Sequence, residues 1–161
     1  MESSVFTFKE LVFSSSEYEQ MLALRNRVLR HPLGRVLDEE DLADEEKQFL
    51  FALFSETGEE MLACVCVRKI CSTAYKLRQM AVAEPMRGRG LGRHLVREVE
   101  QVLAARGGDF VELHARSTAV GFYENLGYQC VGPMFHEVGI AHIKMQKRLK
   151  KKGNPNLGFP E

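Results

Sequence analysis

Glycine and arginine dominate residues 87–93, and this composition suits a site for an anion. Glycine allows a backbone to approach a ligand closely. The apolar spacing that follows predicts a helix, whose first N–H groups lack helical partners and whose dipole adds positive charge. The pattern therefore predicts a pyrophosphate site, with an ordinary turn before a helix as the alternative. The residues that would form it are Arg87, Gly88, Arg89, Gly90, Leu91, Gly92 and Arg93.

Two common nucleotide-binding glycine loops do not fit this segment. A P-loop requires Gly-Lys followed by Ser or Thr, and the chain contains no such triplet. The dinucleotide fingerprint requires a further glycine at position 93 or 95, where the chain has Arg93 and Leu95. The spacing R-x-x-G-x-G, from Arg87 through Gly90 and Gly92, fits a loop between a strand and a helix.

The elements around this loop follow from the spacing of apolar residues. The predicted order is β-α-α-β-β-β-α-β-α-β-β, in which three consecutive strand-like runs favour an antiparallel meander. Helices are expected to begin near residues 16, 38, 91 and 117. Strands are expected at residues 4–11, 49–54, 61–69, 73–82, 109–115, 128–134 and 139–148.

Length and composition predict one folded domain over residues 1–149, with a tail at 150–161. The chain has 161 residues, and 22 basic side chains balance 22 acidic ones, which argues against a general nucleic-acid binder.

The N-terminus does not resemble a signal peptide, and no apolar run reaches about 18 residues. Four cysteines without a C-x-x-C pair indicate reduced thiols. We expect a cytoplasmic protein without a membrane partner.

Two motifs in the right order resemble the GNAT superfamily of N-acetyltransferases. The stretch LRQMAVAEPMRGRGLGRHLV (77–96) resembles the strand, loop and helix that bind coenzyme A in this family. The stretch AVGFYENLGY (119–128) resembles its second signature, A-x-x-F-Y-x-x-x-G-F/Y. The segments at 24–34 and 135–145 are also similar to a bacterial subgroup whose acceptors are mostly unassigned.

The resemblance implies an α/β fold of the α+β kind, with a mixed, mostly antiparallel, V-shaped sheet flanked by helices. The parallel strands 74–82 and 109–115 would splay apart, and acetyl-CoA, the cosubstrate, would lie in the gap without any metal. The backbone of the first strand would pair with the pantetheine arm, as an added strand does. The cofactor-binding residues implied are Met80, Ala81, Val82, Phe122 and the loop residues 87–93.

The resemblance also implies direct attack by a free amine on the thioester, with Tyr123 as the acid for the departing thiolate. A backbone N–H near Val82 would stabilise the oxyanion. The general base that deprotonates the amine is not assigned, because the segment 76–79 contains no carboxylate. A water relay is expected in its place. His114 and a Glu137–His142 pair are candidates to assist it.

Two other chemistries fit the sequence less well. A cysteine nucleophile has no neighbouring histidine in the sequence. An H-E-x-x-H zinc site would need histidine at position 140, where the chain has Ile140.

The acceptor is expected to be a primary amine of a small molecule. Arg25 lies on the apolar stripe of the first helix and is a candidate to bind an acceptor carboxylate, whereas the acidic run 38–46 would suit a cationic acceptor. Two alternatives stay open: a catalytically silent module that binds coenzyme A, and an N-acetyltransferase of proteins. The family resemblance also leaves a homodimer open.

Overall fold

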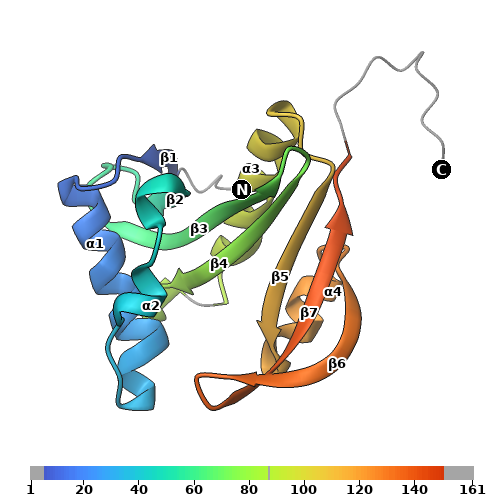
Figure 1. The fold of residues 1–161 in the computed structure, drawn as a ribbon. Helices are drawn as coiled ribbons and strands as arrows, with labels where there is room; N and C mark the ends of the chain where they lie inside the picture. Colours follow the sequence, from blue (N-terminus) through green and yellow to red (C-terminus); the bar gives the residue numbers. More distant parts are fainter. Residues whose placement is uncertain (1–5, 87, 151–161) are drawn as a thin grey trace.

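A seven-stranded sheet runs through the computed structural model, which describes residues 6–86 and 88–150 (Figure 1). The strand order is β1-β2-β3-β4-β5-β7-β6. The β4–β5 pair is parallel and the other described pairs are antiparallel, which confirms the mixed sheet and the meander. The strands are β1 Thr7–Leu11, β2 Phe49–Phe54, β3 Met61–Cys71, β4 Ala74–Val82, β5 Phe110–Arg116, β6 Gln129–Glu137 and β7 Ile140–Arg148.

Helices cover both faces of the first half of the sheet, and this explains its unbroken apolar runs. Helix α1 (Ser16–Arg25) packs on β3 and β4 from one face, and α3 (Leu91–Ala105) packs on β2, β3 and β4 from the other. Strand β2 is buried on both sides from Leu50 onward, so both sets of its alternating side chains are apolar.

The first helix changes its winding before it ends. Helix α1 continues into a π-helical turn, η1 (Asn26–Arg30), and a 3-10 turn, η2 (His31–Leu33), where Pro32 stops the run. A π turn adds one residue to the helix and is common at functional sites. Short helical turns follow at α2 (Glu39–Leu42), η3 (Glu45–Lys47) and η4 (Glu84–Met86).

Strands β4 and β5 run side by side for four residues and then part. Their ladder extends from the pair Ala74 and Phe110 to the pair Leu77 and Leu113, and both strands continue beyond it. Figure 1 shows them diverging from the end at which they meet. Among the described residues no strand pairs with this side of β4 after Leu77, which confirms the predicted splay.

A bulge in β4 lies at the point of divergence. Arg78 pairs with Cys66 and Ala81 pairs with Cys64, so Gln79 and Met80 together oppose Val65. Gln79 has a φ of 57°, which is uncommon for a residue with a side chain. The helix expected to begin near residue 117 is short: η5 covers Ser117–Ala119 and α4 covers Val120–Glu124.

Candidate active site

A cleft of about 1340 Å³ occupies the space in which β4 and β5 part. The N-terminus of α3 borders it at one end, and η1 and the β6–β7 hairpin border it at the other. Most of the predicted site residues line this cleft, although they come from five segments of the chain. They are Met80, Ala81, Val82, Gly88, Gly90, Leu91, Gly92, Arg93, His114, Phe122, Tyr123, Glu137 and His142.

The glycine loop presents backbone rather than side chains to the cleft. Gly88 and Gly90 have φ values of 80° and 78°, a conformation that favours glycine, and Gly90 is the N-cap of α3. A Cβ on either residue would meet nothing within 4 Å, so conformation, not space, requires glycine there. Gly92 differs, because a Cβ there would lie 3.2 Å from the ring of Phe122.

The N-terminus of α3 lies beside these glycines and lines the cleft. Its first helical bond runs from the N–H of His94 to the carbonyl of Gly90, so the preceding N–H groups have no partner within the helix. The arginines contribute unequally. Arg93 lines the cleft, but Arg89 does not, and its Nη1 donates to Met86 Sδ at 3.7 Å. Arg87 lies outside the described residues.

Tyr123 lies on the floor of the cleft with little exposure to solvent. Its relative accessibility is 8%, and its ring packs edge-on against Phe122 and Tyr128. Burial raises the pKa of Tyr123 to about 12, so the phenol is protonated at neutral pH. Within the described part of the chain its hydroxyl makes no hydrogen bond and is free to donate to a ligand.

Glu137 and His142 both lie in the hairpin as expected, but their side chains have different partners. Glu137 lies opposite Ile140 in the hairpin, and its Oε2 lies 2.9 Å from Nδ1 of His114 on β5. His142 lies opposite Phe135, and its Nδ1 donates to the carbonyl of Ile140 at 2.8 Å. Because a carbonyl only accepts, Nε2 of neutral His142 is left with a free lone pair.

Lys76 lies beside His114 and was not predicted as a site residue. Its Nζ lies 3.4 Å from Nδ1 of His114, and its side chain also lines the cleft. Burial, and then the charge of Arg68, lower the pKa of Lys76. The cluster of Lys76, His114 and Glu137 stands where β4 and β5 separate, since His114 directly follows Leu113, the last paired residue. The alternation of side chains along β4 could have indicated that Lys76 faces the cleft. The expectation for this segment was limited to a carboxylate that could act as a base.

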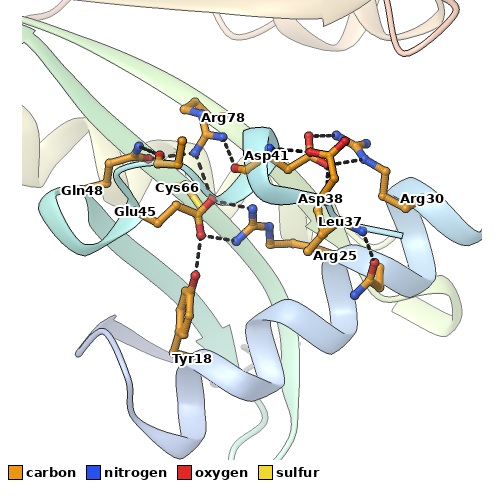
Figure 2. A network of polar contacts seen from close by, with 12 residues as sticks. Tyr18, Arg25, Arg30, Leu37, Asp38, Asp41, Glu45, Gln48, Cys66 and Arg78 are labelled. Atoms are coloured by element: carbon orange, nitrogen blue, oxygen red, sulfur yellow. Dashed lines mark hydrogen bonds and ion pairs between the residues drawn. The ribbon is translucent and has the colours of Figure 1, made fainter. Parts of the chain in front are cut away.

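The structure contradicts the substrate-binding role predicted for Arg25. Its side chain is fully buried and does not line the cleft. Nη1 and Nη2 donate to the two carboxylate oxygens of Glu45, at 2.9 and 2.6 Å (Figure 2). Tyr18 and Arg78 donate to the same carboxylate. The guanidinium is therefore committed to an internal ion pair and is not available to a substrate.

Several acidic side chains of the run 38–46 bind other groups of the protein. Asp38 and Asp41 form the capping box of α2, and Asp41 also binds Arg30, with Oδ1 2.8 Å from Nη2 (Figure 2). Glu45 is the buried partner of Arg25. Glu40 and Asp41 line the cleft, so this part of the run is still exposed to it.

The cysteines lie away from the cleft chemistry. None of the four, all within the described residues, lines the cleft. Cys64 and Cys66 are buried, and burial raises the pKa of both thiols, that of Cys66 to about 11. Across residues 6–86 and 88–150, no group of three His, Cys, Asp or Glu side chains is placed to hold a metal ion. No helix in those ranges has the length and apolar character needed to cross a membrane.

A family model for the acetyltransferase (GNAT) domain matches residues 16–149. The chain belongs to the GNAT acetyltransferases. Among curated GNAT relatives, the uncharacterized N-acetyltransferase YitI of Bacillus subtilis is 38% identical over 80 residues, which cover 49% of this chain and 54% of YitI. This chain spans about half the length of YitI and of YyaT, a second relative from the same organism.

Two solved structures show the same GNAT architecture. The ribosomal-protein-S18-alanine N-acetyltransferase of Escherichia coli matches with a TM-score of 0.74 and 21% identity, over 96% of this chain and 100% of its own. An aminoglycoside 6'-N-acetyltransferase complexed with coenzyme A matches with a TM-score of 0.72 and 17% identity, over 92% and 99%. At these identities the likeness shows a shared fold.

Proposed function

We propose that this GNAT protein transfers an acetyl group from acetyl-CoA to a primary amine of a small molecule. The observation that carries the proposal is the cleft itself. It brings together the edge of β4 that no described strand pairs with, the N–H groups at the start of α3 that lack helical partners, and the buried phenol of Tyr123. Pantetheine would pair with β4 between Met80 and Val82, and the pyrophosphate would bind at Gly88–Arg93.

The reaction in this proposal is direct attack in a ternary complex. The uncharged amine adds to the thioester carbonyl, and the carbonyl oxygen takes up negative charge. A backbone N–H on the edge of β4 near Val82 would stabilise that oxyanion. When the tetrahedral intermediate collapses, the carbon–sulfur bond breaks and the thiolate takes the proton of the Tyr123 hydroxyl. The nitrogen loses its extra proton, which returns through water to the Tyr123 phenolate. Tyr123 suits this role because its raised pKa keeps it protonated.

In this proposal, two histidines are the candidates to remove the proton from the ammonium form of the acceptor. Nδ1 of His114 is held by Glu137, and Nδ1 of His142 by a carbonyl, so Nε2 of each neutral ring would accept a proton. Either could act directly or through a water molecule, as a relay. We therefore retain His114, Glu137 and His142 in the proposed catalytic group, with Glu137 orienting His114.

A hydrogen bond across the cleft supports a small acceptor in this proposal. Nη2 of Arg116, at the end of β5, donates to the carbonyl of Leu29 in η1 at 3.2 Å. This bond joins the two sides of the acceptor end. Proteins and small molecules are both acceptors among the named neighbours, and that comparison does not favour either class.

The proposed activity is tested by thiol release from acetyl-CoA with a broad panel of primary amines, followed by the mass of the product. We expect an acetylated product with at least one small amine. A silent module would bind acetyl-CoA but release no thiol above the rate without enzyme. Turnover only with peptides or protein N-termini would favour the protein N-acetyltransferase instead.

The Gly90→Ala substitution is expected to weaken the binding of acetyl-CoA. Alanine is strained at φ 78° by about 1 kcal/mol, and the strain is relieved by moving the N–H groups that follow. We expect a roughly fivefold rise in Kd by titration calorimetry. Gly58→Ala is the matched control, because Gly58 has φ 81° with open space around it but lies in the β2–β3 turn. An equal loss of affinity in both variants would contradict the assignment.

A further inference from the structure

Arg116 is a cation in the lining of the cleft, and no acid among the described residues forms an ion pair with it. Arg116 is half-buried, and its Nη2 donates to the carbonyl of Leu29. Its neighbour Arg30, by contrast, is neutralised by both oxygens of Asp41. Burial, and then the charge of Arg30, lower the pKa of Arg116, which means that the protein itself disfavours this charge.

Arg116 also stands close to the groups proposed for catalysis. It follows His114 by two residues on β5, so both side chains lie on the same face, with Cα atoms about 7 Å apart. It lies directly opposite His142 in the β5–β7 ladder. A guanidinium with one donor committed to a carbonyl keeps further N–H groups for a ligand, and a carboxylate matches their geometry.

We propose that Arg116 binds a carboxylate of the acceptor, so that the substrates are amines that also carry a carboxylate. This inference rests on the proposed acetyltransferase function and specifies its acceptor. A monoanion suits Arg116, because Glu40, Asp41 and Glu137 line the same cleft and oppose a larger negative charge. A phosphate dianion would be repelled more strongly by these acids.

The test compares amino acids with their own primary amides as acceptors. The probes are glycine, β-alanine, γ-aminobutyrate and ε-aminocaproate, which place the amine at increasing distance from the carboxylate. For at least one pair, we expect the wild-type protein to prefer the acid in kcat/KM by about 10- to 100-fold, the effect of a hydrogen bond to a charged group. Arg116→Gln should bring that ratio close to one, mainly through KM, and Arg116→Lys should restore part of it.

Arg97→Gln is the matched control, because Arg97 is exposed on α3 and does not line the cleft. It should keep the preference for the acid. Equal use of acids and amides by the wild-type protein, or a preference that survives Arg116→Gln, would overturn the role of Arg116 and leave the acetyltransferase function standing. Aminoethylphosphonate used better than β-alanine would overturn the carboxylate in favour of a phosphate group.

A binding measurement separates failure of this inference from failure of the proposed function. Each acid and its amide are titrated by calorimetry into the protein saturated with coenzyme A. Tighter binding of one acid, lost in Arg116→Gln, would support the carboxylate site even if no amine were acetylated. Equal affinities of acid and amide throughout the series would overturn it.

Discussion

Tyr123→Phe is expected to lower kcat for acetyl transfer by about 10²- to 10⁴-fold, the usual contribution of a positioned general acid. The phenyl ring keeps the contacts with Phe122 and Tyr128, while the proton for the departing thiolate is lost. Thiol release under saturating acetyl-CoA measures kcat, and calorimetry measures whether acetyl-CoA still binds. We expect binding to remain.

Tyr75→Phe is the matched control for this change. Tyr75 is also buried, at 1% exposure, but it belongs to the core under α3 and does not line the cleft. Its substitution should leave kcat within the error of the assay. A Tyr123→Phe protein with full kcat would remove Tyr123 from the mechanism and assign protonation of the thiolate to another group or to water.

Glu45→Gln is expected to destabilise the fold by about 3–5 kcal/mol, because it leaves the buried guanidinium of Arg25 without its counter-charge. Arg25 and Glu45 are both fully buried, and Tyr18 and Arg78 also bond to Glu45 (Figure 2). Urea unfolding gives the free energy directly. Glu46→Gln, one residue along and exposed, is the control and should cost little.

The same carboxylate predicts part of the pH dependence of stability. Burial alone would raise the pKa of Glu45, but the hydrogen bonds and charge of Arg25 outweigh it and hold the pKa below the usual 4.5. Ionisation of Glu45 therefore stabilises the fold above that pH, and the stabilisation is lost as the pH falls through the lowered pKa. Glu45→Gln should remove this share of the acid dependence. An unchanged acid profile would contradict the role of the pair.

The order of elements was predictable because burial leaves a period in the sequence. The alternating and continuous apolar runs gave β2, β3 and β4, and the glycines around 88–92 marked the start of α3. The bulge at Gln79 was not predictable in this way. A positive φ at glutamine has no residue signature, because it is imposed by the register of β4 against β3 rather than by local preference.

The contacts of Arg25 and Glu137 could not be predicted for one reason. A charged residue in a sequence reveals little about which distant residue it will contact. Arg25 follows the apolar stripe of α1 because it is buried, and only the fold brings Glu45, 20 residues away, to its guanidinium. Glu137 and His142 are neighbours in sequence, but the register of the hairpin offsets them and turns Glu137 toward His114. The unpaired charge of Arg116 likewise emerges only when the walls of the cleft are assembled.

The central claim is that the space between β4 and β5 binds acetyl-CoA, and a thermal titration with acetyl-CoA tests it most directly. A ligand that binds only the folded state at 100 times its Kd stabilises the protein by about 2.7 kcal/mol. For a chain of this length, that corresponds to a rise of roughly 5–10 °C in Tm, saturating with concentration. A Tm that does not change up to millimolar acetyl-CoA would contradict the account.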